Sequence, residues 1–184
     1  YQTNEVQQIP YTFDKGVESW VNFGINKEVW RLYQSGQFVH RFALIEDWLK
    51  EDGWFKREDI EPGKYLDAIG VIYRFTEVFE FLKRLLNNNP ALSDGGKISI
   101  SLHNTKDRIL EILFDKMRAG LFGEYKTKIN PIRIEMRFMK DEILNNAQEM
   151  ALKACIQLFD DFNWDNQPIN VFKNDQDKFL NRQI

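Results

Sequence analysis

The sequence predicts an α+β fold, with a mostly antiparallel sheet of about five strands and two long helices packed on one of its faces. Three observations lead to this prediction. Two pairs of β-rich runs are joined by short turns, one further run alternates strictly between apolar and polar residues, and two long segments repeat apolar residues at helical spacing. Short turns favour antiparallel pairing, and alternating strands need one covered face, which two apolar-striped helices can supply.

The chain is expected to begin with an irregular lead-in over residues 1–26, followed by a single domain over residues 27–184. This domain opens with a hairpin, in which residues 28–34 pair with residues 38–44 across a short turn that contains Gly36. The hairpin supplies the first two strands of the expected sheet.

An acidic and aromatic loop is expected next, at residues 45–61, and the first long helix follows it. Pro62 suits the first turn of this helix, which we extend to about Asn87. Apolar residues fill most of its surface and leave only a narrow polar stripe, so the helix is expected to lie against the core over much of its circumference.

A second hairpin is predicted after a turn at residues 94–96, which read Asp-Gly-Gly. Its strands are residues 97–103 and 108–114, joined by a turn at residues 104–107. In the first of these strands, isoleucine and leucine side chains alternate with serine and histidine side chains, so one face is apolar and the other polar.

The last strand and the remaining helices follow from clear periodic patterns. Residues 131–138 show the cleanest alternation in the chain, with apolar side chains expected to point inward and charged side chains outward. A second long helix is predicted at about residues 141–162, and a short terminal helix near residues 174–181.

Composition and charge limit the possible classes of function. The 25 basic and 28 acidic residues give a net charge of −3, so any nucleic-acid role would need a local basic patch. Because no apolar run is long enough to span a bilayer and the chain has only one cysteine, we expect a cytoplasmic protein that does not enter a membrane. The chain starts at Tyr1 rather than at Met, which suggests a domain excised from a longer chain.

No residue pattern indicates a catalytic centre, a metal site or a cofactor. His40, His103 and Cys155 make a poor set of metal ligands, and Cys155 lies on the apolar stripe of the second helix, where a thiol is usually inert. One alternative stays open. The carboxylates of the loop at residues 46–61 could hold a divalent metal ion in a hydrolase, although interleaved lysine and arginine residues favour a solvated loop.

The sharpest functional signal is a set of arginines on the polar side of the expected sheet. If the alternation holds, four arginines share the side opposite the helices with His103: Arg31, Arg41, Arg133 and Arg137. Guanidinium groups suit bidentate contacts with phosphate or carboxylate, so this face is a candidate site for an anionic partner. The competing interpretation is a solvated face with cross-strand ion pairs through Glu135.

Four segments, spread over all the main elements, resemble a domain found after the AlbA-like, Schlafen-type DNA-binding domain of bacterial transcriptional regulators. They are WRLYQSGQFVHRFALIEDW (30–48), IYRFTEVFEFLKRL (72–85), ISISLHNTKDRIL (98–110) and ALKACIQLFDDFNWD (151–165), about a third of the chain. None of them is a catalytic motif. The resemblance implies a C-terminal accessory domain of a bacterial protein and supplies no functional residues.

Together these observations predict a non-catalytic binding or regulatory module of a larger bacterial protein, which is expected to be a DNA-binding regulator. Nucleic acid, reached through a neighbouring domain, and a second copy of the chain are the expected partners. The alternatives are the metal-dependent hydrolase described above and a pure dimerisation domain that uses Trp48, Trp54 and Trp164 as interface anchors.

Overall fold

The computed structural model describes residues 9–50, 57–88, 94–115 and 117–183. Helices and antiparallel strands are both present, so the predicted mixed α+β class is confirmed. The chain divides into two compact units, residues 1–64 and residues 65–184. This boundary differs from the one that the sequence suggested at residue 26.

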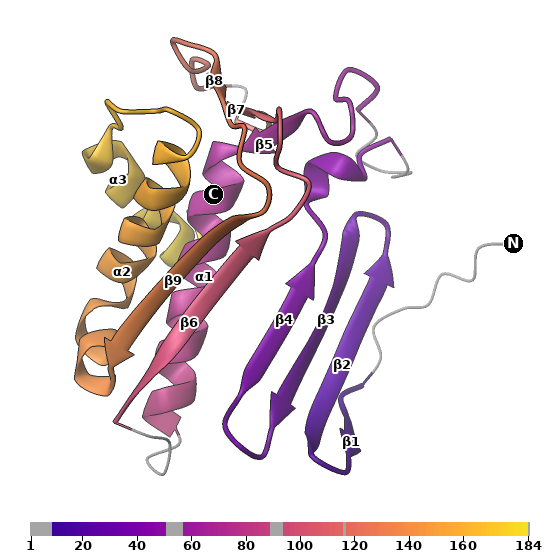
Figure 1. Cartoon of the computed structure of the whole chain (residues 1–184), viewed down its shortest axis with the longest axis vertical. Helices are drawn as coiled ribbons and strands as arrows, with labels where there is room; N and C mark the ends of the chain where they lie inside the picture. Colours follow the sequence, from indigo (N-terminus) through magenta and orange to yellow (C-terminus); the bar gives the residue numbers. More distant parts are fainter. Residues whose placement is uncertain (1–8, 51–56, 89–93, 116, 184) are drawn as a thin grey trace, which may run out of the picture. The chain divides into compact units, whose positions relative to one another are not determined.

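The first unit is built on a four-stranded antiparallel sheet in the order β1-β2-β3-β4 (Figure 1). Its strands are β1 (Tyr11–Phe13), β2 (Gly16–Phe23), β3 (Asn26–Tyr33) and β4 (Phe38–Phe42). The prediction of an irregular lead-in over residues 1–26 is therefore wrong for its described part, which contains β1 and β2.

The missed signal is a two-residue turn between β2 and β3. Phe23 pairs with Asn26, and Gly24 adopts a positive φ of 53°, as the tight turns of β-hairpins require. The predicted hairpin at residues 28–44 is confirmed in β3 and β4, and Gly36 at its turn has a φ of 82°. A short 3-10 helix, η1 (Ile45–Asp47), follows β4.

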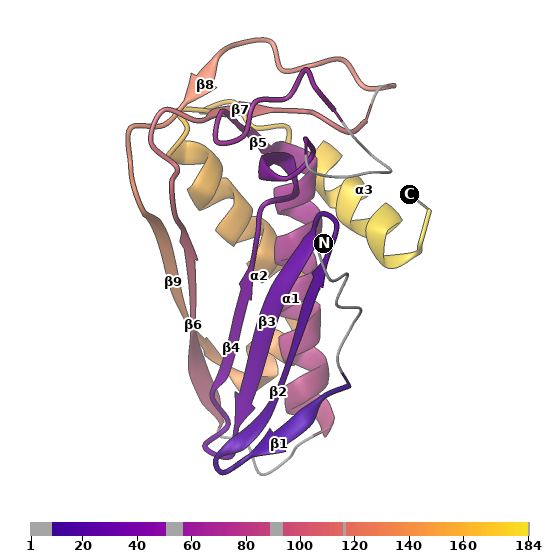
Figure 2. The same cartoon turned by 90° about the vertical axis from the view of Figure 1, so that its right-hand side faces the viewer.

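The second unit contains a two-stranded antiparallel ribbon of β6 (Gly95–Leu102) and β9 (Ile132–Met139). Two long helices, α1 (Ala68–Asn88) and α2 (Lys140–Asp160), pack against each other and lie on one side of this ribbon, which Figure 2 shows edge-on. The helix α3 (Ile169–Leu180) packs against both. The two predicted long helices and their position on one face of strands are thus present.

The predicted second hairpin is wrong, because β6 pairs with β9 and not with residues 108–114. Those residues supply only β7 (Ile109–Glu111), which pairs in parallel with β5 (Tyr65–Asp67) and antiparallel with β8 (Tyr125–Lys126). Strand β7 is too short to match the eight residues of β6, whereas β9 has the same length and the same alternation.

The buried side chain of Arg108 draws the chain away from β6. It is 1% exposed and donates to two backbone carbonyls, those of Asn104 at 2.8 Å and of Tyr65 at 2.7 Å. A buried guanidinium needs such acceptors, so Arg108 ties the turn after β6 to the beginning of β5. No local sequence pattern indicates this contact.

The first helix begins later than predicted. Strand β5 occupies residues 65–67, and the carboxylate of Asp67 accepts the N–H of Gly70 at 2.6 Å, as an N-cap residue does. Pro62 therefore lies before α1 instead of in its first turn. The helix α3 begins at Ile169, before the residue 174 that was expected, while α2 matches its prediction within two residues at each end.

The expected turn at residues 94–96 is wrong, because Gly95 and Gly96 belong to β6. A Cβ atom at Gly95 would lie 2.6 Å from the carbonyl oxygen of Phe138, and one at Gly96 would lie 2.7 Å from the Phe138 ring. These glycines allow the close approach of β9.

The core of the second unit lies between the helices and the inner side of the ribbon. Cys155 on α2 is 0% exposed there, and its burial raises the pKa of its thiol, in agreement with the prediction of an inert cysteine. None of the helices in the described part of the chain is long and apolar enough to cross a membrane.

Candidate functional site

The ribbon of β6 and β9 has two chemically different faces, because successive residues of a strand point in opposite directions. Its inner face is apolar and buried or half-buried: Ile98, Ile100, Leu102, Ile132, Ile134, Met136 and Phe138. Its outer face carries seven exposed side chains, here called the ribbon face: Lys97, Ser99, Ser101, Arg133, Glu135, Arg137 and Met139. The predicted alternation of both strands is therefore confirmed.

Positive charge exceeds negative charge on the ribbon face. The register places Lys97 directly opposite Arg137, so two cations are cross-strand neighbours. Glu135 is the only carboxylate of the face. It accepts a charged hydrogen bond from Lys97 at 2.8 Å, which holds the pKa of Glu135 below its usual range. Among the described residues, neither Arg133 nor Arg137 forms an ion pair.

Three of the five predicted site residues belong to this unit. Arg133 and Arg137 share the ribbon face as expected, and His103 is exposed directly after the last residue of β6. Lys97 was not among the predicted site residues, although its odd-numbered position in the alternating run KISISL places it on the same side as Ser99 and Ser101. The cross-strand ion pair expected through Glu135 exists, but Lys97 supplies its cation instead of an arginine.

The other two predicted site residues, Arg31 and Arg41, share one face of the four-stranded sheet. Arg31 lies opposite Val39, and Arg41 lies opposite Val29. Arg31 forms an ion pair with Glu18 on β2, whereas Arg41 is exposed and forms none within the described residues. Because these two arginines belong to the first unit, a single face formed by all five predicted residues stays a prediction.

The acidic loop does not form a ligand cluster in its described part. Asp47 accepts the N–H of Gly63 at 2.8 Å, and Asp59 receives two hydrogen bonds from Arg57 at 2.8 and 2.6 Å. Glu51 and Asp52 lie outside the described residues. Within the ranges that the structure covers, no group of three or more His, Cys, Asp or Glu side chains could hold a metal ion.

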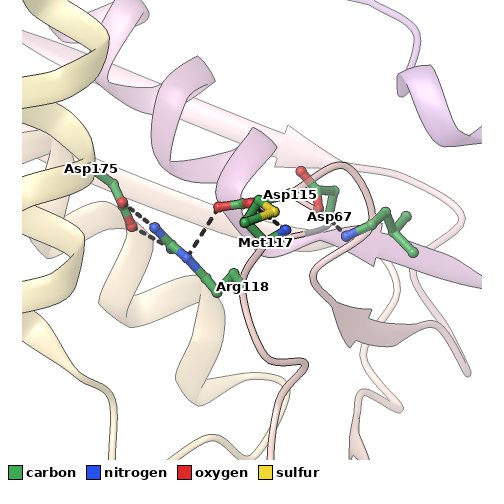
Figure 3. Close-up of polar contacts among 6 residues, drawn as sticks. Asp67, Asp115, Met117, Arg118 and Asp175 are labelled. Carbon is green, nitrogen blue, oxygen red and sulfur yellow. Dashed lines mark hydrogen bonds and ion pairs between the residues drawn. The ribbon is translucent and has the colours of Figure 1, made fainter. Parts of the chain in front are cut away.

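A second charged cluster, which the sequence analysis did not predict, lies where α3 meets the loop after β7 (Figure 3). Asp175 on α3 is 0% exposed and receives two hydrogen bonds from Arg118, at 2.8 and 2.6 Å. Asp115 lies 3.4 Å from the same guanidinium. This bidentate geometry is the strongest form of an arginine–carboxylate contact.

Asp67 belongs to the same region and is 3% exposed. Its two carboxylate oxygens accept backbone N–H groups, one from Leu113 at 2.8 Å and one from Gly70 at 2.6 Å. Burial raises the pKa of Asp67 above its ordinary value, although the two backbone hydrogen bonds act in the opposite direction. Such a shift occurs at functional sites, but it also occurs in structural networks.

We interpret this buried cluster as a structural clamp. Asp67 fixes the first turn of α1 and the chain after β7, while Asp175 and Arg118 fasten the following loop to α3. A helical pattern could have revealed one member, because Asp175 is three residues after the buried Phe172 and therefore falls on the apolar side of α3. Arg118 lies in a loop, where no periodic signal exists.

Aromatic contacts also correct one predicted interface residue. Trp164 is 5% exposed and packs against the rings of Tyr125, Phe159 and Phe172, so it belongs to the core of the second unit and is no interface anchor. Trp48 is half-buried beneath the ammonium group of Lys27, at 4.3 Å. Trp54 lies outside the described residues.

Comparisons of the chain with protein-family models, with curated proteins and with solved structures find no match. The resemblance to an accessory domain of bacterial regulators therefore stays a prediction. The chemistry of the described side chains is the remaining basis for a functional assignment.

Proposed function

We propose that this chain is a non-catalytic binding module of a larger DNA-binding regulator, and that its ribbon face binds the phosphate groups of nucleic acid. The observation that carries this proposal is the pair of cations, Lys97 and Arg137, directly opposite each other on an exposed face. Arg133 adds a third cation, and only Glu135 opposes them.

The cost of this arrangement to folding supports a role in binding. Like charges directly opposite each other in a sheet are destabilising, so the contact of Lys97 with Arg137 does not itself favour folding, although Lys97 also forms an ion pair with Glu135. A bound phosphate would remove the repulsion and accept hydrogen bonds from both side chains. Because the guanidinium groups of Arg133 and Arg137 form no ion pair with any residue that the structure describes, no such ion pair has to break before they bind.

Exposure and chemistry on the ribbon face suit a backbone contact more than base recognition. Lys97 retains 51% of its side-chain exposure despite its ion pair with Glu135, so it is open to solvent and to partners. Ser101 lies opposite Arg133 and can donate a hydrogen bond to a phosphate oxygen, whereas the hydroxyl of Ser99 donates to Glu135 at 3.4 Å. Contacts of this kind position a protein on nucleic acid and make its affinity depend on salt.

The test is a salt titration of binding to a fluorescein-labelled DNA duplex, followed by fluorescence anisotropy. The variant Arg133→Ala/Arg137→Ala should bind about tenfold more weakly at low salt, and the slope of log affinity against log salt should fall by about 0.9 for each lost phosphate contact. The matched control is Lys153→Ala/Lys173→Ala, which removes two exposed cations from α2 and α3.

The control separates a specific surface from bulk charge, because both double variants change the net charge equally. Equal losses in the two variants would contradict the proposed site, since the affinity would then follow net charge alone. A wild-type chain that shows no salt-dependent binding would contradict the proposed function itself.

A further inference from the structure

The backbone of β9 shows which of its residues face away from β6. The N–H of Lys140 donates to the carbonyl oxygen of Asp94 at 2.6 Å, and these two residues continue the register of the ribbon. In an antiparallel ladder, hydrogen-bonded pairs alternate with pairs that are not hydrogen-bonded. The even-numbered residues of β9 therefore bond to β6, which agrees with the Phe138 carbonyl oxygen lying close to Gly95.

It follows that Arg133, Glu135, Arg137 and Met139 direct their N–H and C=O groups toward the other edge of β9. Within the described residues of the second unit, β9 pairs with β6 alone, so this edge has no strand beside it. An unpaired edge of eight residues is a ready template for another strand.

We infer that the free edge of β9 pairs antiparallel with the β9 strand of a second copy of this chain. The charges along this edge alternate in sign, because Arg133, Glu135 and Arg137 follow one another on the ribbon face. Three like charges would prevent self-pairing. A positive-negative-positive order permits it, provided that the two strands are offset by one pair of residues.

The offset register places Glu135 of each copy opposite Arg137 of the other. It pairs residues that both direct their backbone groups outward, so the hydrogen-bond ladder is compatible with this register. The register without the offset would place Glu135 opposite Glu135 and Arg133 opposite Arg137. Every pair of charged side chains on the ribbon face would then be a pair of like charges. Neither Arg133 nor Arg137 has an ion-pair partner in the described chain, so Arg137 is available for the contact.

The apolar residues of β9 fit the same register. Met136 would lie opposite Met136 on the inner face, and Ile134 would lie opposite Phe138. On the outer face, Met139 would lie beside the aliphatic part of Arg133. Met139 is 62% exposed, which is high for a methionine, and the second copy would cover part of it. The resulting contact is isologous, as a twofold dimer requires.

The edge of β6 does not have this property. Its outward-facing side chains are Lys97, Ser99 and Ser101, with one cation and no carboxylate, so no register of β6 with itself forms an ion pair. Charge complementarity thus favours self-pairing through β9 over self-pairing through β6. Dimerisation would join the two ribbon faces into one sheet surface, but it does not depend on nucleic-acid binding.

The experiment measures the mass of the full chain by sedimentation equilibrium, without nucleic acid. The wild-type chain should form dimers. Glu135→Arg, which makes the edge wholly positive, should weaken the dimer by about tenfold or more, and Arg133→Glu/Arg137→Glu, which makes it wholly negative, should do the same. An equimolar mixture of the two variants should form a heterodimer, because their edges are complementary.

Two further variants test whether a loss of the dimer comes from the β9 edge itself and not from a change in net charge or a loss of the fold. Glu135→Pro removes an N–H that points away from β6, so it should abolish the dimer while circular dichroism shows an unchanged fold. Lys173→Glu on α3 reverses an exposed charge away from the edge and should leave the dimer unchanged. A monomeric wild-type chain would overturn the inference, and so would a dimer that survives both Glu135→Arg and Glu135→Pro.

Discussion

The second unit contains two charged clusters that differ in how their charges are satisfied. In the buried cluster, Asp175 is fully enclosed and bound by both arms of Arg118, and Asp67 accepts two backbone N–H groups. On the ribbon face, Arg133 and Arg137 are exposed and, within the described residues, form no ion pair.

In this unit, a buried charge with a perturbed pKa is a weaker indication of function than an exposed charge without an ion-pair partner. The buried carboxylates of Asp67 and Asp175 accept hydrogen bonds that hold loops and helix ends in place. On the ribbon face, Arg133 and Arg137 form no ion pair within the described residues, and Arg137 lies directly opposite Lys97, a contact between like charges that is destabilising. This difference supports the interpretation of the first cluster as structural and the proposal that the second binds a partner.

The largest expected effect is on stability, and it tests the assignment of the buried cluster. Replacing Asp175 by Ala leaves the guanidinium of Arg118, which is 24% exposed, without its main partner. Breaking a buried pair from one side usually costs several kcal/mol, so we expect the free energy of unfolding to fall by about 3 kcal/mol. Urea denaturation monitored by tryptophan fluorescence measures this change.

Asp115→Ala is the matched control, because Asp115 contacts the same guanidinium at 3.4 Å but retains 39% of its side-chain exposure. Exposed pairs contribute little, so its loss should be below about 1 kcal/mol. If the two variants lost equal stability, burial would not distinguish the two contacts, and the clamp would have to be reconsidered.

A second prediction concerns the pH dependence that Asp67 gives to folding. Burial raises its pKa above the ordinary value of 3.8, so the folded chain holds the proton more tightly than the unfolded chain. The stability that this group contributes is therefore fully present below pH 3.8 and is lost as the pH rises through the pKa of the folded state. Asp67→Asn removes the titration and so should remove this loss.

The measurement is the free energy of unfolding of the wild-type chain and of Asp67→Asn across the acidic range. The variant loses one of the two backbone contacts and should be less stable at every pH, but the gap between the two proteins should narrow as the pH rises. A gap that widens would mean that the N–H groups of Leu113 and Gly70 favour the carboxylate more than burial disfavours it.

The features of the fold that could be predicted are those encoded by local periodicity. The alternation in β9, the spacing of apolar residues in α2 and the glycine turn before β4 each specify a structure without reference to distant residues. Strand pairing is different, because β6 had two possible partners of suitable sequence. Only the length of β9 and the buried contacts of Arg108 decide between them.

The same reasoning explains the outcome for the candidate site. Arg133 and Arg137 could be placed on one face because they lie four residues apart on a single strand, and residues an even number of positions apart point to the same side. Their relation to Lys97 needed the pairing of β6 with β9, which the predicted second hairpin had obscured. The contact of Arg118 with Asp175 joins residues 57 positions apart through a loop, and no local pattern specifies it.

The smallest effect is expected from Glu135, and it tests the ribbon face most directly. Glu135 is the only carboxylate of the face and is held ionised by Lys97, so it opposes the binding of an anion and occupies one cation. Glu135→Gln should therefore raise the affinity for a labelled DNA duplex by about threefold, as expected for one exposed charge. The assay uses chain concentrations at which the protein is monomeric, since the same residue is proposed to stabilise the dimer.

The control is Asp160→Gln, which replaces an exposed acid at the end of α2. A gain in Asp160→Gln as large as that in Glu135→Gln would show that net charge and not the ribbon face sets the affinity, whereas a gain confined to Glu135→Gln means that the released Lys97 joins Arg133 and Arg137 in binding phosphate.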